Sequence, residues 1–334
     1  MIYLQDWMRG DNMTIKILLT GGGGAGNEAL YRLLEGRYTL YFGDADVSTI
    51  NPIIPKDRRY KLPLASDPNF CVNVCEICRH LNIDLLIPGV DEELLKFAEN
   101  VDLFMPTKLL MPDKDYIKIM LDKFSMINSL SAKNIPVPFS RILTDDLTEI
   151  NFPCISKPRV GRGSKNVKII NSFDEAEALK LKEGSFANQI LIQNKINGTE
   201  YTVQMFADNQ TRLCSIVPVK VDIKKGITLS AETESEPRVI KACKAIHQAI
   251  PTKGCYNIQL ILNKKGQVLP FEINPRVSTT LCLSVAAGID PIAIFFGAMK
   301  YEKMPQFISG IRLRRHWSNY FFYENTVINQ EVVK

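Results

Sequence analysis

Three polar residues in the last third of the chain have the types and spacing of a site for a phosphate-bound metal ion. Glu272 and Asn274 lie two apart in the run VLPFEIN, so on a strand both side chains point to one face. Gln259 lies on the preceding predicted strand, across a hairpin. Oxygen ligands of these types suit magnesium that bridges phosphates, with manganese as the alternative ion. Arg276, just past the strand, would clamp a transferring phosphoryl group or an anionic intermediate.

A second group has the chemistry of a phosphate cradle. Lys157-Pro158 ends a predicted strand and is followed by Gly161-Arg162-Gly163-Ser164. A lysine beside a flexible glycine loop neutralises phosphate oxygens while backbone N–H groups close over them. Lys123, at the start of a predicted helix, supplies a second cation. A lone Lys-Pro and a glycine turn are equally compatible with a purely structural role.

Two further segments add polar groups that suit a nucleoside. The run QNKINGTE (193–200) predicts a strand, a glycine turn and an acid at the next strand start, where Glu200 would accept hydrogen bonds from ribose hydroxyls. The backbone of this segment would read the adenine edge. Downstream, SIVPVKVDIKKG offers Lys220, Lys224 and Lys225 as cations near a second sheet face, and we assign Lys220 to the nucleotide. A solvated charge run explains these lysines equally well.

The glycine-rich turn near the amino terminus supports a competing interpretation. Gly21, Gly23 and Gly26 follow a predicted strand and open a helix, and Asp44 ends the next strand. This is the pattern of a dinucleotide-binding turn, which would make the protein an NAD(P)-dependent oxidoreductase. Many α/β domains use such a turn only to pack a helix against a strand. The sequence downstream also contains no set of residues typical of dehydrogenase catalysis.

A cysteine cluster has the spacing of an iron–sulfur site but is better explained as a helix face. Cys71, Cys75 and Cys78 occupy positions i, i+4 and i+7, which share one side of a helix. Reduced cysteine is more often a small buried hydrophobe than a ligand. The three histidines, at 80, 247 and 316, lie far apart, and we interpret them as structural.

Composition sets the broad class of the protein. The chain has 334 residues, 46% of them hydrophobic and 23% charged, and a net charge of +5 that is spread along the sequence. This balance suits a small anionic ligand better than a nucleic acid, and we find no apolar run long enough to span a membrane. Eight cysteines without a secretory signal predict reduced thiols in the cytoplasm.

The order of predicted elements indicates an α/β protein that is α+β overall. Strands and helices alternate over 14–112, including a short strand at 102–105, which predicts a Rossmann-like parallel sheet. Residues 113–198 predict linker helices and a small lobe, and 199–334 a large lobe and a carboxyl-terminal segment. Residues 1–13 are expected to be an extension outside the fold. Pro270 interrupts the strand that carries Glu272, so we expect an edge strand or a bulge there.

The runs KPRVGRGS, QNKINGTEYTV and FEINPRVSTTLCLSVAAGIDPIA resemble the ATP-grasp superfamily, and are most similar to its carbamoyl-phosphate-synthase-like and amino-acid-ligase branch. The resemblance covers about residues 14–300. It implies two antiparallel lobes that hold ATP between them, and a carboxylate that is phosphorylated to an acyl phosphate for attack by an amine. The expected ligands are ATP and magnesium, and the expected substrates are a small carboxylate and a small amine. A homodimer is an open expectation.

The resemblance also assigns roles to individual residues. Lys123 and Lys157 match the phosphate-binding cations, and Lys157 and Arg276 the groups at the reacting phosphate. The remaining matches are the loop Gly161, Gly163 and Ser164, the adenine hinge Gln193 and Lys195, the ribose acid Glu200, and the metal ligands Gln259, Glu272 and Asn274. The family hinge usually begins with Glu, and this chain departs from that pattern with Gln193. An ATP-grasp protein that binds nucleotide without turnover is the second alternative.

Overall fold

The amino-terminal part of the chain forms a parallel sheet with helices on both faces. The computed structural model describes residues 14–163, 165–297, 304–323 and 326–328, so the expected extension 1–13 and Ser164 lie outside the described residues. The five strands have the order β3-β2-β1-β4-β5. They are β1 (Lys16–Thr20), β2 (Thr39–Asp44), β3 (Arg59–Lys61), β4 (Leu85–Ile87) and β5 (Lys108–Leu109).

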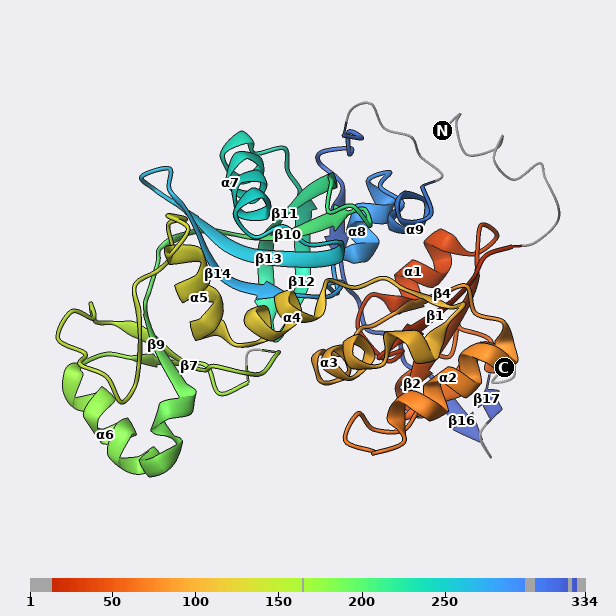
Figure 1. Cartoon of the computed structure of the whole chain (residues 1–334), viewed down its shortest axis with the longest axis horizontal. Coiled ribbons are helices and arrows are strands. Elements are labelled where there is room, and N and C mark those ends of the chain that lie inside the picture. The colour runs from red at the N-terminus through yellow and green to blue at the C-terminus, as the bar shows by residue number, and fades with distance from the viewer. Residues whose placement is uncertain (1–13, 164, 298–303, 324–325, 329–334) are drawn as a thin grey trace.

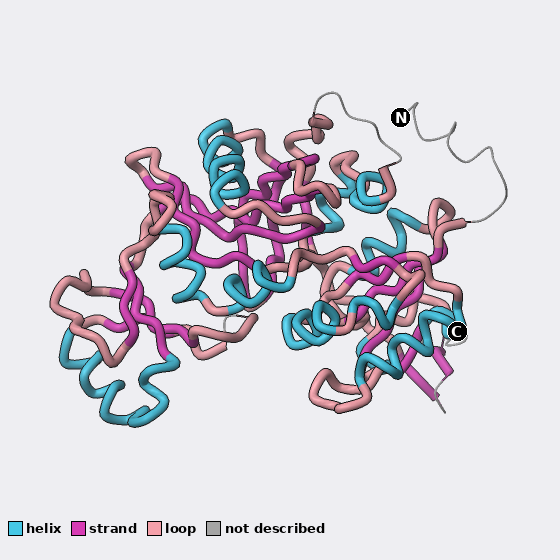
Figure 2. The backbone as a smooth tube through the Cα atoms, in the orientation of Figure 1, coloured by secondary structure: helices cyan, strands magenta, loops and turns pink. Residues whose placement is uncertain are grey.

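Alternation along the central strand explains why helices cover both faces of this sheet. Ile17 and Leu19 of β1 pack on the side of α1 (Asn27–Leu34), while Leu18 packs on the side of α2 (Phe70–Leu81) and α3 (Asp91–Glu99). Figures 1 and 2 show these layers. The chain order β1-α1-β2 and the parallel pairing confirm the predicted Rossmann-like sheet.

Two antiparallel sheets follow. The larger has the order β14-β13-β10-β11-β12-β15, and the smaller has the order β6-β9-β7-β8. The large sheet comprises β10 (Gly198–Ala207), β11 (Leu213–Lys225), β12 (Ile227–Thr233), β13 (Gly254–Asn263), β14 (Val268–Asn274) and β15 (Arg312–Arg314). The small sheet comprises β6 (Ser140–Ile142), β7 (Cys154–Pro158), β8 (Lys168–Ile170) and β9 (Ile190–Asn194). The predicted fold class is therefore confirmed.

Helices cover these sheets in a way that leaves one face of the large sheet polar near β14. The helices α4 (Lys114–Leu121), α5 (Lys123–Ser131) and α7 (Pro237–Ala249) share a core with one face of the large sheet. The helix α6 (Phe173–Glu183) covers the small sheet. The short helices α8 (Leu281–Ala286) and α9 (Pro291–Phe295) join the amino-terminal sheet and the large sheet in one hydrophobic cluster. A last hairpin pairs β16 (Phe321–Tyr323) with β17 (Thr326–Ile328).

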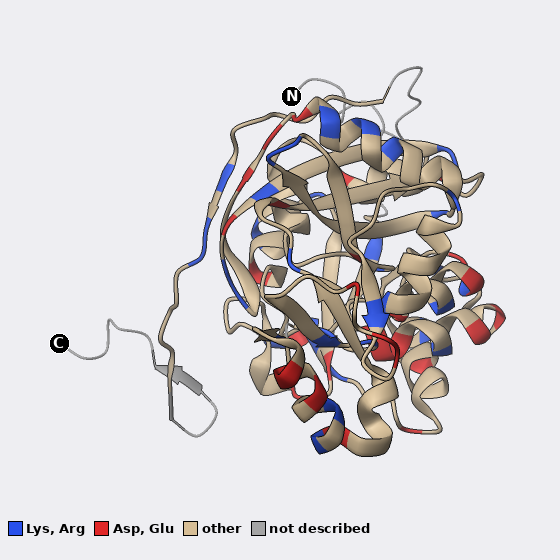
Figure 3. Ribbon diagram, turned by 90° about the vertical axis from the view of Figure 1, so that its left-hand side faces the viewer, with Lys and Arg blue, Asp and Glu red and all other residues tan. Residues whose placement is uncertain are grey.

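The surface carries both signs of charge. Figure 3 shows basic and acidic residues interspersed over the described elements, in agreement with the modest net charge of +5. None of the helices in the described ranges is both long and apolar enough to cross a membrane.

The expected strand at 102–105 is wrong. Val101–Phe104 forms a 3-10 helix, in which Leu103 N donates to Asn100 O. Phe104 is buried there, with its ring 5.3 Å from that of Phe97. A short apolar run does not by itself distinguish a strand from a helical turn, and here aromatic packing against α3 decides the conformation.

The cysteines on α2 lie on one buried helix face, as predicted. Cys71, Cys75 and Cys78 pack in the core beneath the parallel sheet, together with Val74 and Phe97. Burial raises the pKa of Cys78 to about 12, so its thiol is a neutral core group.

The glycine-rich turn serves close packing. Gly23 N donates to the Asp44 carboxylate at 2.9 Å, so Asp44 closes the turn from within the chain. Gly26 has a φ of 121°, and a Cβ there would lie 2.5 Å from the carbonyl oxygen of Thr279, at the start of α8. The glycine is therefore required where the amino-terminal sheet meets the large lobe.

We expect Gly26→Ala to destabilise the protein by about 3 kcal/mol or more, because it adds a backbone clash to the cost of a positive φ. Gly36→Ala is the matched control. Its φ is 82° but nothing lies within 4 Å of the added Cβ, so only the strain of about 1 kcal/mol applies. Urea unfolding of both variants measures the difference, and equal losses would contradict the packing role of Gly26.

Candidate functional site

Three lysines from different elements converge on the polar edge of the large sheet. Lys157 comes from β7 of the small sheet, Lys123 from the first residue of α5, and Lys224 from the end of β11. Lys157 and Lys123 are buried, with 6% and 7% of their surfaces exposed. Buried lysines require oxygen partners, and the partners here come from both sheets.

The amino group of Lys157 links the two antiparallel sheets. Its Nζ donates to Gln193 Oε1 at 2.9 Å within the small sheet and to the Phe271 carbonyl at 3.2 Å in the large sheet. The Gln193 amide is oriented by its own bond to Ser140 Oγ at 2.9 Å. Burial lowers the pKa of Lys157 to about 8. Glu272 opposes this shift, while the nearby Lys123 and Lys224 reinforce it.

A β-bulge makes the Phe271 carbonyl available. Gln259 pairs with Glu272, but Leu260 pairs with Pro270, so Phe271 is the extra residue on β14. β14 is also the edge strand of the large sheet. The expectation drawn from Pro270 is confirmed on both counts, because a proline without an N–H is tolerated at an edge and at a bulge.

The oxygen-bearing residues lie on one face of the large sheet. Glu272 and Gln259 are register partners on β14 and β13, and Asn274 pairs with Asn257 in the same way. Asn274 Nδ2 donates a hydrogen bond to Asn257 Oδ1 at 3.2 Å, so the side-chain oxygen of Asn274 is not used in that contact. Lys123 Nζ lies 3.7 Å from Glu272 Oε1, reaching around the edge strand from α5.

The third lysine neutralises the opposite end of the same face. Lys224 Nζ lies 2.5 Å from Glu200 Oε1 and 2.9 Å from Gln259 Oε1. Glu200 stands on β10, which pairs directly with β13, so its side chain shares the face of Gln259. The cation thus lies between the acid and the amide that the sequence assigned to ribose and metal.

Lys220 does not join this group, and its assignment to the nucleotide is corrected here. It is the register partner of Tyr201, whose side chain lies in the core on the opposite face of the sheet from Glu200. Its amino group lies 3.8 Å from Glu234. A bulge around Asp222 shifts the register of β11, which reverses the side-chain alternation and brings Lys224 to the polar face.

Arg276 lies at the junction with the amino-terminal domain. Its Nε donates to the Asp91 carboxylate in an ion pair that is largely buried, and its Nη1 donates to the Val277 carbonyl at 3.0 Å. The Arg276 carbonyl accepts from Asn257 Nδ2 at 2.9 Å. The sequence contains no pattern that pairs Asp91 with Arg276, because the two residues come from different domains.

The glycine loop and the hinge complete the set of predicted residues. Lys123 Nζ donates to the Gly161 carbonyl at 2.7 Å, which anchors the start of the loop, and Gly163 is exposed. Lys195 is exposed in the segment between β9 and β10. Arg159, just after β7, forms an ion pair of 2.6 Å with Asp122, which caps α5, so the base of the loop is tied to the helix that presents Lys123.

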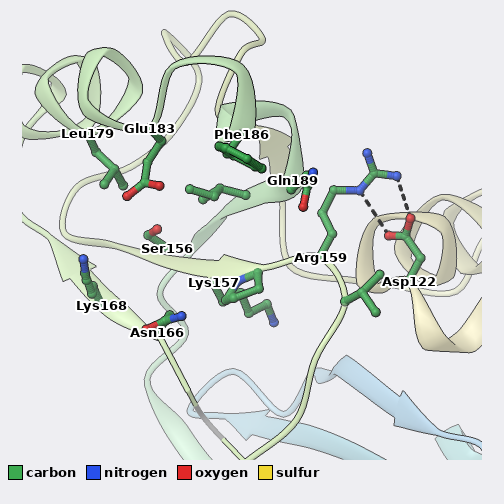
Figure 4. Close-up of a pocket in the computed structure, with 13 residues that line it drawn as sticks. Asp122, Ser156, Lys157, Arg159, Asn166, Lys168, Leu179, Glu183, Phe186 and Gln189 are labelled. Carbon is green, nitrogen blue, oxygen red and sulfur yellow. Dashed lines mark hydrogen bonds and ion pairs between the residues drawn. The ribbon is translucent and has the colours of Figure 1, made fainter. Parts of the chain in front are cut away.

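A pocket of about 490 Å³ lies on the other side of the small sheet. Ser156 and Lys168 of the sheet line it together with Leu179, Glu183 and Phe186. Figure 4 shows the Lys157 amino group directed away from Glu183 and Phe186, and the ion pair of Arg159 with Asp122 at the rim. Lys157 thus lines this pocket as well, but its amino group is directed to Gln193 and Phe271 and not toward α6.

The geometry has clear counterparts among known sequences. The profile of the family described as "ATP-grasp in the biosynthetic pathway with Ter operon" matches residues 186–316. The carbamoyl phosphate synthase large chain of Methanothermobacter thermautotrophicus is 28% identical over 181 residues, 48% of this chain and 17% of that protein. The formate-dependent phosphoribosylglycinamide formyltransferase of Ignicoccus hospitalis is 23% identical over 238 residues, 64% of this chain and 58% of that protein. The aligned region is thus less than two thirds of each relative.

Solved structures share the fold. The biotin carboxylase domain of the Hydrogenobacter thermophilus 2-oxoglutarate carboxylase, in complex with MgADP, ADP and bicarbonate, has a TM-score of 0.65 at 15% identity, covering 90% of this chain and 73% of its own. The L-amino acid ligase of Bacillus licheniformis has a TM-score of 0.62 at 16% identity, covering 86% and 74%. Residues 186–316 thus match an ATP-grasp family, the chain is similar in sequence to carbamoyl phosphate synthase large chains, and its fold is shared with the biotin carboxylase domain and the L-amino acid ligase.

Proposed function

We propose that the protein is an ATP- and magnesium-dependent ligase that activates a small carboxylate as an acyl phosphate and joins it to a small amine. The observation that carries this proposal is the convergence of Lys123, Lys157 and Lys224 on the face of Glu272 and Gln259, where the two antiparallel sheets meet. Three cations around one acidic edge suit a polyphosphate whose charge is shared with a metal ion.

The nucleotide would lie between the two antiparallel sheets. Lys123 and Lys157 would bind its phosphates, and the backbone of Gly161 and Gly163 would cover them. Gln193 and Lys195 would flank the adenine, and Glu200 would hold the ribose hydroxyls once Lys224 turns from it toward phosphate. The biotin carboxylase domain of the Hydrogenobacter thermophilus 2-oxoglutarate carboxylase shares this fold and was solved with MgADP, which supports a nucleotide of this class.

Gln259, Glu272 and Asn274 fit a magnesium ion by the chemistry of their donors. Each offers a hard oxygen, and the register of β13 and β14 places all three on one face. Magnesium, or manganese, bound there would neutralise charge on the phosphate oxygens. Lys123, at 3.7 Å from Glu272, would share that task from the side of α5.

The chemistry requires positioning more than acid–base catalysis. A carboxylate oxygen of the substrate attacks the γ-phosphorus and ADP leaves. An amine nitrogen then attacks the acyl carbon, inorganic phosphate leaves, and the nitrogen loses a proton. Arg276 and Lys157 would stabilise the charge on the transferring phosphoryl group, and the loop over the site would exclude water from the acyl phosphate.

The experiment that tests this function screens ADP release against pools of carboxylic acids and amines. With the right carboxylate, hydroxylamine should trap the acyl phosphate as a hydroxamate, with ADP and phosphate formed together. We expect Glu272→Gln to lower turnover roughly 100-fold or more, because the amide keeps its size but loses the charge that binds a hard cation. Glu177→Gln, on the exposed side of α6, is the control and should retain full activity.

Three outcomes would overturn the proposal in different ways. Release of AMP and pyrophosphate would indicate adenylation of the carboxylate. Tight binding of magnesium–ATP without ADP release from any pool would favour a nucleotide-binding protein without turnover. Stabilisation by NAD and not by magnesium–ATP would restore the dinucleotide interpretation of Gly21, Gly23, Gly26 and Asp44.

The bulge in β11 predicts opposite behaviour for two lysines four residues apart. Lys224→Met should weaken ATP binding about 10- to 100-fold, the range for a lost hydrogen bond to a charged group. Lys220→Met should leave it unchanged, because Lys220 faces Glu234 on the other side of the sheet. Calorimetric titration with magnesium–ATP measures both, and a larger loss for Lys220→Met would contradict this placement.

The lowered pKa of Lys157 predicts that nucleotide affinity depends on pH. Below about pH 8 the amine is protonated and binding is strongest. As the pH rises above 8, binding must take up a proton, because phosphate raises the pKa of the amine in the complex. Affinity should then fall by up to about tenfold per pH unit. Titrations in buffers of different ionisation enthalpy report the proton uptake, which should be absent in Lys157→Met.

A further inference from the structure

The first turn of α3 connects three parts of the molecule through three consecutive acids. Asp91 pairs with Arg276, Glu92 pairs with Arg162, and Glu93 accepts a hydrogen bond from the Thr20 hydroxyl at the end of β1. Arg276 follows the strand with the proposed metal ligands, and Arg162 belongs to the glycine loop of the small lobe. One turn of the amino-terminal domain therefore contacts both halves of the proposed ATP site.

The contact of Glu92 spans two domains. The loop after β7 extends from the small sheet toward α3, as Figure 1 shows. Arg162 Nε donates to both carboxylate oxygens of Glu92, at 3.1 and 3.3 Å. Both side chains are about half exposed. The Lys123 bond to the Gly161 carbonyl fixes the loop at its base, so Glu92 provides a second attachment farther along the loop.

The contact of Asp91 fixes the direction of a guanidinium group. Only 13% of the Arg276 side chain and 14% of the Asp91 side chain are exposed. The Asp91 carboxylate accepts a hydrogen bond from Arg276 Nε, and the Val277 carbonyl accepts one from Nη1. The planar guanidinium group is therefore held at two of its edges. A buried arginine that lost this carboxylate would carry an uncompensated charge and would turn toward other oxygens.

The third acid ties the turn to the rigid sheet. Glu93 is buried, and the Thr20 hydroxyl that donates to it also accepts from Gly89 N at 3.0 Å, so β1, the segment after β4 and α3 share one network. The turn that carries Asp91 and Glu92 is therefore held by the core of the amino-terminal domain.

We propose that Asp91 and Glu92 are positioning residues for phosphoryl transfer: Glu92 holds the glycine loop over the nucleotide through Arg162, and Asp91 aims Arg276 at the reacting phosphate. This inference rests on the proposed function and adds a role for the amino-terminal domain. The ATP site is then completed by residues outside the two lobes that bind ATP.

Limited proteolysis tests the role of Glu92 without knowledge of the substrates. Trypsin cuts after Arg162 and Lys165, and mass spectrometry identifies both products. Glu92→Gln should speed cleavage at these sites about two- to fivefold, the range for an ion pair between half-exposed side chains. It should speed dissociation of a fluorescent ADP analogue in magnesium to a similar extent. Glu99→Gln, at the other end of α3 and paired with Lys114, is the matched control and should behave as the unmodified protein.

Two further cleavage measurements, one at high salt and one with the two charges exchanged, distinguish loss of the Glu92–Arg162 ion pair from a general loss of stability. Raising the ionic strength to about 0.5 M should bring the unmodified protein toward the cleavage rate of Glu92→Gln, since exposed charges are screened. Combining Glu92→Lys with Arg162→Glu should restore protection at Lys165 that each single change removes. Equal cleavage of the unmodified protein and Glu92→Gln at every salt concentration would overturn the role of Glu92.

The role of Asp91 has a separate kinetic signature. Asp91→Asn should lower the kcat of ADP release more than tenfold while changing the Kd for magnesium–ADP little, because Arg276 acts on the transferring group. Asp91→Glu should recover part of the loss. A change in Kd with kcat intact would refute the positioning role. Failure of the unmodified protein to bind magnesium–ADP at all would instead refute the proposed function itself.

Discussion

One buried ammonium group determines how the two antiparallel sheets meet. Lys157 belongs to the small sheet but donates to Phe271 of the large one, and it has little water around it. A charge in such a place is tolerated only if oxygens surround it. Gln193, oriented by Ser140, and the carbonyl released by the bulge supply them. The bulge on β14 and the placement of Gln193 on β9 both provide the oxygens that this amine requires.

The position of β14 at the sheet edge has a second effect. An interior strand would be flanked on both sides, whereas β14 leaves one side open to α5 and the small lobe. Lys123 therefore reaches Glu272 from α5, and Lys157 reaches Phe271 from β7. The same edge would be exposed to pairing with another chain, and Pro270 reduces that hazard because it removes a donor from the ladder.

The elements that sequence predicted well are those with local signals. Cys71, Cys75 and Cys78 share one buried helix face, as their spacing predicts, and Pro270 marks both an edge and a bulge. The choice of Lys220 over Lys224 failed because a bulge around Asp222 reverses alternation, and no residue pattern there announces it. The pairing of Asp91 with Arg276 was not predicted, since contacts between domains leave no periodicity in the sequence. The proposed nucleotide and metal roles follow from chemistry and resemblance, and the geometry gives them a common location.

The hydrophobic clusters indicate that the small sheet and the rest of the protein differ in how cooperatively they unfold. The amino-terminal sheet and the large sheet share one apolar cluster, which runs from Ile17 through α8 to Val219. The small sheet has its own cluster around Cys154 and Ile192, beneath α6. Amide exchange should therefore separate two units of stability, coupled where Leu191 of β9 packs in the core of the large sheet and Lys157 donates to Phe271. The nucleotide proposed to lie between the two antiparallel sheets would then be released by partial opening of the small lobe, while the amino-terminal sheet and most of the large sheet stay folded.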